Sequence, residues 1–269
     1  MKAFQTIMTL ALLSLSQLAL ATEGVLIVSK STNLSSQQIT TSKIYLTDSK
    51  LQISNSGQDN SSMIFDANKE VFTFIDNKKR EYYQFDKPTL VQLKEQLKMM
   101  VQVMKQFASQ MPEEQQKKLD MILNPSNGAI INYKETGTGK VGNWNTKQFQ
   151  GTNENEKVLE LNIASFETLG IEAEKFNAMK QLIDFFTENL QEVATMLPTS
   201  QSMSAISFDE NSPILKEGFP VKTRTYAEGS SKSETIIQSI TETGIAESQF
   251  SIPSGYARKT INMQQQFQK

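Results

Sequence analysis

The chain has 269 residues, with 27 lysines and arginines against 29 acidic residues and a formal net charge of −2. It contains neither histidine nor cysteine. These absences exclude histidine-based catalytic triads, thiol nucleophiles, disulfides and zinc sites built from histidine or cysteine. The mild net charge argues against nucleic acid as a partner.

The first 21 residues have the composition of a cleaved export signal. Lys2 is a short basic start, Ile7–Leu15 is an apolar core too short to span a membrane, and Ala19-Leu20-Ala21 fits the cleavage rule of signal peptidase. We expect cleavage before Thr22, which changes the net charge to −3 because Lys2 is the only charged residue removed. An exported chain without disulfides is typical of a bacterial periplasm. We therefore expect a periplasmic protein without a transmembrane segment, and secretion to the medium is the alternative.

Short apolar segments alternate with polar turns between Gly24 and Phe85. Turn residues recur at Asp48-Ser49, Asp66-Ala67-Asn68 and Asp76-Asn77, and large apolar side chains occupy every second position between them. This rhythm predicts an antiparallel meander. The expected strands centre on Val25–Val28, Ile44–Leu46, Leu51–Ile53, Met63–Phe65, Val71–Ile75 and Tyr83–Phe85.

Two longer stretches, Pro88–Met111 and Glu172–Leu197, have the apolar spacing of amphipathic helices. In each, large apolar residues follow one another at intervals of 3, 4, 3, 4, 3 and 4, which places them on one helix face. Met99, Val101 and Val103 widen the first stripe, and a broad face suits a sheet better than a single partner helix. The stripes are Leu90, Leu93, Leu97, Met100, Met104, Phe107 and Met111, then Phe176, Met179, Ile183, Phe186, Leu190, Val193 and Leu197.

Between and after these helices the pattern returns to strands. Pro112 is expected to break the first helix, and a shorter helix then ends near Asn124-Pro125. From Ala129 onward apolar and polar residues alternate, as in Leu159-Glu160-Leu161, which indicates a sheet with one buried face. A long loop is expected at Thr199–Gly218, followed by strands at Phe219–Ala227, Ser233–Glu242 and Ser248–Ile252.

These elements predict an α+β fold. We expect a strongly curved antiparallel sheet of about eleven or twelve strands, an unclosed β-barrel, with its concave face covered by the two long amphipathic helices. Residues 22–262 are expected to form one domain, and residues 263–269 a disordered polar tail. The alternative is a division into two domains near Asn127. The strands after Gly218 argue against it, because they would have no helix of their own to cover.

Several short motifs match functional patterns by letter but lack the required context. Gly137–Gly142 reads G-x-G-x-x-G, yet more strand follows it instead of a helix, so a glycine-rich turn is expected. Asp66–Glu70 begins like a calcium loop but is followed by Val71 where glycine is needed. Lys78-Lys79-Arg80 reads as a solvated hairpin tip, with contact to anionic headgroups as the alternative. Trp144 reads as a core or interface residue, with ligand stacking as the alternative.

Several segments together resemble a known family. They are Met63–Phe72, Phe74–Tyr83, the Met-rich helix, Gly139–Trp144, Gly218–Thr223 and Phe250–Tyr256. They are similar to an exported bacterial domain of unknown function, number 4412, grouped with the outer-membrane lipoprotein carriers of the LolA-like fold. The resemblance implies an unclosed β-barrel capped by helices, with an apolar cavity that holds acyl chains in the carriers. The carriers use an arginine inside the barrel, whereas Arg80, the only arginine in the first half here, lies in a basic turn, so no functional residue is transferred.

The sequence and the resemblance together predict a periplasmic, non-catalytic binding protein for a lipophilic ligand. The ligand would be an acyl chain or a lipidated partner, held between the curved sheet and the helices. The predicted apolar lining consists of Leu97, Met100, Met104, Phe107, Phe176, Met179, Ile183, Phe186 and Leu190. Ordinary packing against the sheet is the alternative use of the same stripes.

A second hypothesis is a protein–protein interaction or assembly module of the cell envelope. In that reading the loop Thr199–Gly218 or an exposed sheet edge captures another envelope protein, and no small-molecule ligand is involved. An enzyme is the third hypothesis, because no spacing among the 29 acidic residues singles out a catalytic pair. We expect no cofactor, no metal and no nucleic acid partner.

Overall fold

The structure is a computed structural model that describes residues 21–57, 60–107, 131–189, 212–227 and 229–260. The export signal, the short helix after Pro112, most of the loop Thr199–Gly218 and the polar tail lie outside these residues, so those predictions are not tested. Among the described helices, none is both long enough and apolar enough to cross a membrane.

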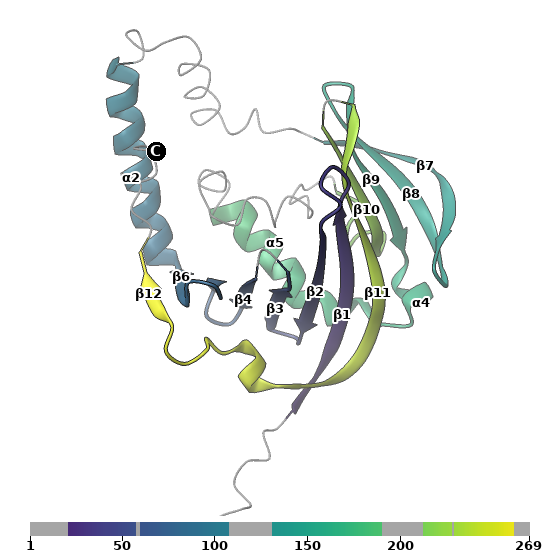
Figure 1. Cartoon of the computed structure of the whole chain (residues 1–269), viewed down its shortest axis with the longest axis horizontal. Helices are drawn as coiled ribbons and strands as arrows, with labels where there is room; N and C mark the ends of the chain where they lie inside the picture. The colour runs from purple at the N-terminus through teal and green to yellow at the C-terminus, as the bar shows by residue number, and fades with distance from the viewer. Residues whose placement is uncertain (1–20, 58–59, 108–130, 190–211, 228, 261–269) are drawn as a thin grey trace, which may run out of the picture.

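Twelve strands of the described residues form one curved sheet (Figure 1). Their order is β12-β6-β5-β4-β3-β2-β1-β11-β10-β9-β8-β7, and every neighbouring pair is antiparallel except β12 with β6. The sheet is open, because β12 and β7 lie at opposite ends of this order. The strands are β1 (Ala21–Asn33), β2 (Ile39–Leu46), β3 (Lys50–Asn55), β4 (Ser61–Asp66), β5 (Val71–Asp76), β6 (Glu81–Phe85), β7 (Asn132–Val141), β8 (Trp144–Asn153), β9 (Glu156–Ala164), β10 (Phe219–Ala227), β11 (Ser230–Ala246) and β12 (Ala257–Lys259).

Strands from both halves of the chain are joined by the long strand β11. Strand β11 pairs with the whole length of β1 on one side and with β10 on the other, so the meander β1–β6 and the strands β7–β10 belong to one sheet. The predicted meander from Gly24 to Phe85 is confirmed strand by strand. The alternation in β9 is also confirmed, since Leu159, Leu161 and Ile163 are buried while Glu160 and Asn162 are half-buried.

The described helices are α2 (Lys87–Phe107), α4 (Phe166–Leu169) and α5 (Asn177–Asn189), with 3₁₀ turns η3 (Ala173–Phe176) and η5 (Glu247–Phe250). Helix α2 begins one residue earlier than expected. Asp86 caps it, because its Oδ1 accepts a hydrogen bond from the Thr89 backbone N–H at 2.9 Å. The second predicted helix begins as the 3₁₀ turn η3 and becomes α-helical only at Asn177.

Helix α5 lies inside the curve of the sheet, whereas α2 stands at one end of it (Figure 1). Leu90 and Leu93, in the first turns of α2, join the main hydrophobic core, and the sheet strand that α2 contacts most is β6. The predicted covering of the concave face by two long helices is therefore not what the described residues show. In the described residues α5 lies over β3 and β4, and α2 contacts the sheet through the N-terminal end of the helix.

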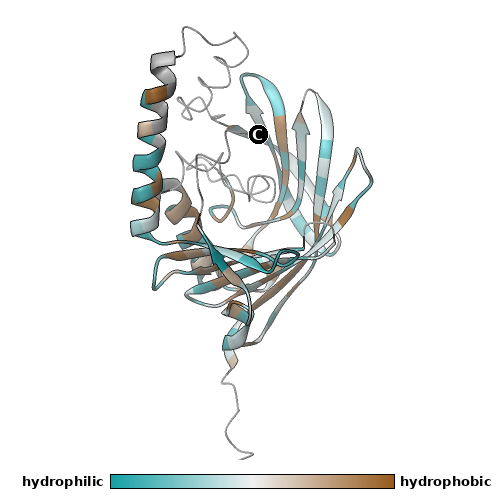
Figure 2. Ribbon diagram, turned by 60° about the vertical axis from the view of Figure 1, so that its left-hand side comes forward, coloured by the Kyte–Doolittle hydropathy of each residue, from teal (hydrophilic) through white to brown (hydrophobic). Residues whose placement is uncertain are grey.

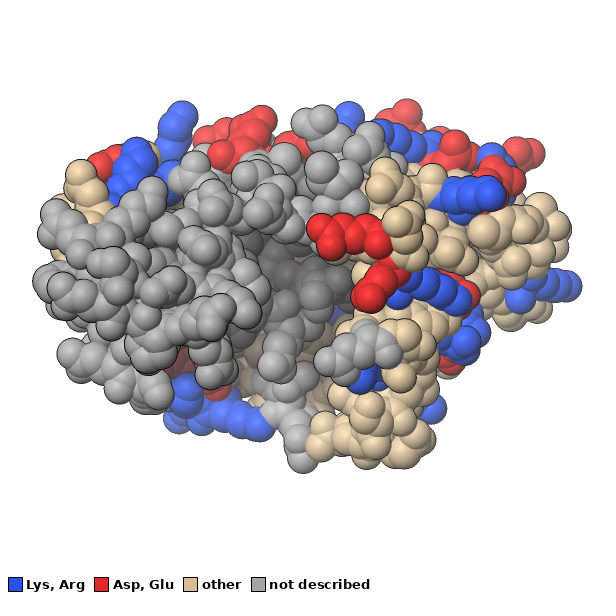
Figure 3. All heavy atoms as spheres, turned by 90° about the horizontal axis from the view of Figure 1, so that it is seen from above, with Lys and Arg blue, Asp and Glu red and all other residues tan. Residues whose placement is uncertain are grey.

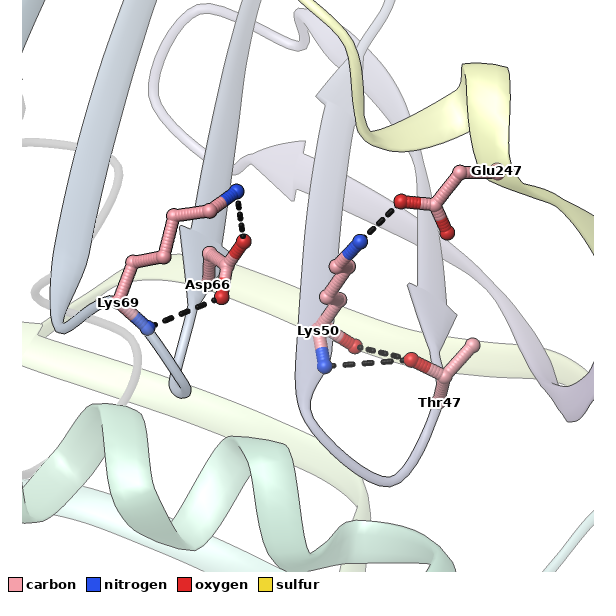
Figure 4. Close-up of polar contacts among 5 residues, drawn as sticks. All are labelled: Thr47, Lys50, Asp66, Lys69 and Glu247. Atoms are coloured by element: carbon pink, nitrogen blue, oxygen red, sulfur yellow. Dashed lines mark hydrogen bonds and ion pairs between the residues drawn. The ribbon is translucent and has the colours of Figure 1, made fainter.

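The convex face of β3–β6 is covered by the C-terminal segment that leads to β12, residues 247–256, which we call the strap. It runs along the outside of the sheet from β11 to β12 (Figure 1). The prediction of a strand at Ser248–Ile252 is wrong, since the 3₁₀ turn η5 occupies most of this stretch and the last strand is β12. The Lys50 ammonium is hydrogen-bonded to the Glu247 carboxylate (Figure 4). The Gln249 side chain is hydrogen-bonded to that of Gln52, and the two contacts attach the strap to β3.

The motifs that match only by letter belong to hairpins. Gly137–Val141 is part of β7, so the predicted glycine-rich turn is confined to its end, where Gly142, at a φ of 54°, opens the tight turn to β8. Asp66 closes the β4–β5 hairpin by accepting a hydrogen bond from the Lys69 backbone N–H at 3.1 Å and binding the Lys69 ammonium at 2.9 Å (Figure 4). Trp144 is half-buried against the main core.

Candidate ligand-binding face

The concave face of the sheet is lined by alternate residues of β1–β6, which we call the concave face residues. They are Val25, Ile27, Ile44, Leu46, Leu51, Ile53, Met63, Phe65, Phe72, Phe74 and Phe85, and each is at most 9% exposed. Their alignment follows from the register, because Leu51 pairs with Phe65 and Phe65 with Phe72. Side chains at paired positions share a face.

Aromatic rings join α5 to this face. The Phe65 and Phe185 ring centroids are 5.4 Å apart, and those of Phe72 and Phe186 are 5.0 Å apart in an edge-on arrangement. Figure 2 shows hydrophobic residues along both α5 and the strands that it faces. Edge-on and tilted ring pairs at this separation are favourable beyond the burial of their area. Helix α5 is therefore held on the sheet by aromatic side chains that point into the curve.

Three of the nine predicted lining residues are fully buried in this core. Phe176, Met179 and Phe186 are 1%, 2% and 4% exposed, and Phe176 contacts the Phe219 ring of β10 at a centroid distance of 5.1 Å. Ile183 is half-buried. The side chains of Leu97, Met100, Met104 and Phe107 and the whole of Leu190 lie outside the described part of the structure, so their role as lining stays a prediction.

Helix α2 has apolar side chains on two sides. Leu90 and Leu93 are 2% and 5% exposed, whereas Val91, Met99 and Val103 are 55%, 59% and 54% exposed. We expected Met99 and Val103 to widen a buried stripe, and this expectation is wrong. Both residues lie on the helix face away from Leu90 and Leu93, which is the face that solvent reaches.

A second hydrophobic cluster lies over β8 and β9, and the sequence analysis predicted its strand face but not the part of Ile214 in it. Phe149, Leu161 and Ile163 pack there with Ile214, which lies in the segment predicted as a long loop, Thr199–Gly218. Ile214 forms a bridge with Gly218, and the Leu215 N–H donates to the Gly218 carbonyl at 2.8 Å. The signal available was the apolar pair Ile214-Leu215 between polar residues.

Charged side chains on β9–β11 form a network on the face opposite Leu159 and Leu161. Glu234 is bound by Arg224 through Nε at 3.0 Å and by the Lys222 ammonium at 3.0 Å. Burial raises the pKa of Glu234, but the hydrogen bonds from Arg224 and Lys222 outweigh it and hold that pKa below its usual value. The pKa of Glu160 is lowered in the same way. Burial raises it, but the hydrogen bonds from Lys157 and Tyr226 outweigh burial and hold it below its usual value.

The two acidic side chains of this network are each paired with basic side chains, Glu234 with Arg224 and Lys222 and Glu160 with Lys157. In the described ranges, no group of three or more acidic side chains is arranged to hold a metal ion. Acidic and basic side chains are interspersed among the described residues on the face that Figure 3 shows. The apolar concave face, packed against α5, is the candidate ligand-binding face of the described structure.

Comparisons with known proteins give fold-level likenesses only. No protein-family model matches the chain, and no curated protein does. An uncharacterized conserved protein from Thermus thermophilus is 6% identical, with 93% of this chain and 98% of that chain covered and a TM-score of 0.46. PNGF-II is 8% identical, and the match covers 91% of this chain and 32% of the PNGF-II chain with a TM-score of 0.38. A chain of the Pseudomonas aeruginosa MucA/MucB complex is 8% identical, and the match covers 88% of this chain and 58% of that chain with a TM-score of 0.38.

At these identities and TM-scores the likenesses carry no functional conclusion for this chain. The open, mostly antiparallel sheet agrees with the expected unclosed barrel. Membership of domain family 4412 stays a prediction, because no family model matches.

Proposed function

We propose that the chain is a non-catalytic periplasmic binding protein that holds a lipophilic ligand, an acyl chain or a lipidated partner, between the concave face and helices α2 and α5. The observation that carries the proposal is the course of α2. Its apolar stripe enters the core at Leu90 and Leu93, and the helix continues to Phe107 beyond its contact with β6. Positions 97, 100, 104 and 107 fall, by helical phase, on the same side as the two leucines.

An apolar ligand is the occupant that suits such a surface. Each methylene of an acyl chain taken from water contributes about 0.8 kcal/mol. The concave face residues and their α5 partners are aliphatic or aromatic, with no charged side chain among them. Methionines such as Met63 and Met179 add side chains that adapt to the shape of a ligand. In this proposal Phe176, Met179 and Phe186 form the floor, and Leu97, Met100, Met104, Phe107, Ile183 and Leu190 complete the lining.

Two adjacent methionines of α2 supply a matched test. The Met100→Glu variant places a charge on the proposed ligand side, and the Met99→Glu variant places the same charge on a side chain that is 59% exposed. Each variant is purified without detergent, extracted with organic solvent, and analysed by mass spectrometry for lipid per protein. We expect an acyl lipid in the wild type and in Met99→Glu, and at least about tenfold less in Met100→Glu, because a buried charge next to an acyl chain is costly.

Two outcomes contradict the proposal. One is an extract of the wild type that contains no stoichiometric lipid. The other is equal lipid content in the two variants, which would place the lipid elsewhere on the chain. Thermal unfolding of both variants, measured in parallel, shows whether the Met100→Glu protein is folded when its lipid is counted.

The exposed side of α2 favours a second candidate, the interaction module. Val91, Met99 and Val103 expose apolar surface at intervals of 8 and 4 residues along one helix side. An apolar helix side of this kind can lie in a groove of another protein. Crosslinking in cells separates the two candidates, because a specific protein adduct lost in Met99→Glu but kept in Met100→Glu supports the module.

A further inference from the structure

The edge of the sheet at β6 is occupied by the short strand β12 of the same chain. Ala257, Arg258 and Lys259 pair in parallel with Glu81, Tyr82 and Tyr83, and the Ala257 N–H donates to the Arg80 carbonyl at 2.9 Å. All three β12 residues are exposed. Parallel pairing is slightly less stable per residue than antiparallel pairing. By length, orientation and burial, β12 is therefore the weakest strand attachment in the described sheet.

The strap that leads to β12 is attached by contacts that do not involve β12. The Tyr256 hydroxyl donates to Asn77 Oδ1 at 3.2 Å, and the Arg80 guanidinium lies 5.7 Å from the Tyr256 ring centroid. Between this anchor and η5 the strap covers the convex face of the sheet. Gly255, at a φ of 77°, turns the chain immediately before the anchor. The strand β12 can consequently leave the edge of β6 while the strap stays in place.

The charges at this edge are complementary to a basic strand. The Lys259 ammonium lies 3.2 Å from the Glu81 carboxylate, and both side chains are partly exposed. The pKa of Asp86, at the end of β6, is lowered by the hydrogen bonds from Thr89 and, more weakly, by the charge of Arg258. Two cations of the β5–β6 turn are engaged by other groups, since Lys79 is paired with Asp76 at 3.2 Å and Arg80 with the Tyr256 ring.

We propose that the outer edge of β6 is a strand-addition site for a basic, extended segment of a partner protein, and that β12 is a displaceable plug on that site. An added strand gains main-chain hydrogen bonds to β6, and its basic side chains meet Glu81 and Asp86. The strand continues through Gln84 and Phe85 beyond the last β12 pair. A longer incoming strand therefore gains pairs that β12 does not make.

A peptide competition tests the proposal on the full chain. The probe is a fluorescent peptide of the protein's own segment Pro253–Thr260, and the control peptide carries glutamate at both basic positions. The plug is removed in two independent ways. Ala257→Pro abolishes the donor to Arg80 without a change of charge, and the double variant Arg258→Glu with Lys259→Glu repels β12 from the acidic edge.

We expect both plug variants to bind the basic peptide at least about tenfold more tightly than the wild type, because the tethered β12 competes at a high effective concentration. The control peptide should not bind. Amide hydrogen exchange of Glu81–Phe85 should be faster in Ala257→Pro and should slow again with the peptide. A matched variant, Lys134→Glu with Lys140→Glu on the exposed strand β7, changes the net charge equally and should behave as the wild type.

Three results would overturn the proposal. Equal, weak peptide binding by wild type and plug variants would make β12 a simple edge cover. Tight binding by the β7 variant would show a nonspecific charge effect. A wild-type dimer that is lost in Ala257→Pro, measured by light scattering, would assign the edge to a second copy of the chain.

Discussion

The contact between Phe72 of β5 and Phe186 of α5 gives a quantitative test of how α5 is held on the sheet. The two side chains are 1% and 4% exposed, and their rings meet edge-on at 5.0 Å. Each change to alanine removes a buried aromatic ring and leaves a cavity, so each should lower the free energy of unfolding by about 3–5 kcal/mol. The double variant should lose about 0.5–1.5 kcal/mol less than the sum of the two single losses, because each single variant already removes the contact between the rings.

Urea unfolding of the wild type, the two single variants and the double variant measures this coupling energy. A control cycle pairs Phe72→Ala with Phe250→Ala, since Phe250 lies under Lys50 in the strap on the opposite face of the sheet. That cycle should be additive to within about 0.5 kcal/mol. A coupling energy near zero for Phe72 with Phe186, at unchanged urea dependence, would refute the packing of α5 on β5.

Three further changes have expected outcomes. Asp86→Ala should cost about 0.5–2 kcal/mol of unfolding free energy, since it removes the cap of α2, and circular dichroism should show less helix. Gly218→Ala should lower the free energy of unfolding by about 2–6 kcal/mol in a thermal or urea melt, because the φ of Gly218 is 138° and an added Cβ would lie 2.0 Å from a backbone oxygen. Gly142→Ala is the control, because Gly142 has open space around it and only its positive φ is strained, so the loss should be about 1–2 kcal/mol. Glu234 has a lowered pKa in the folded chain, so its stabilising effect is present above about pH 4.3 and lost as the pH falls through the folded value; Glu234→Gln should therefore lose less unfolding free energy than the wild type between about pH 6 and pH 3.

The strand pattern was predictable because the two faces of each strand differ in burial. In β9 the alternation of Leu159, Leu161 and Ile163 with polar residues identified both the strand and its buried face. The same reasoning failed at the strap. Phe250 and Ile252 alternate as in a strand and are half-buried, but they belong to the strap, in which Phe250 is part of the 3₁₀ turn η5. Local periodicity does not distinguish such a segment from a strand.

The helices show a second limit of the sequence pattern. The spacing of Leu90 and Leu93 correctly predicted a buried side of α2. The exposure of Met99 and Val103 was not predictable, because apolar width on a helix gives no information on how far its partner extends. For the candidate site, Phe176, Met179 and Phe186 are buried in the core, and their role as ligand lining stays a prediction. The same spacing serves a packed core and a ligand-lined one, so sequence alone left both readings open.

The central claim is that the apolar concave face and its helices hold a lipophilic molecule. Native mass spectrometry of the protein, purified without detergent, measures this directly. The account predicts a species heavier than the bare polypeptide by the mass of an acyl-chain ligand, which is lost on denaturation and reduced in Met100→Glu. A native mass equal to that of the polypeptide alone would contradict the claim.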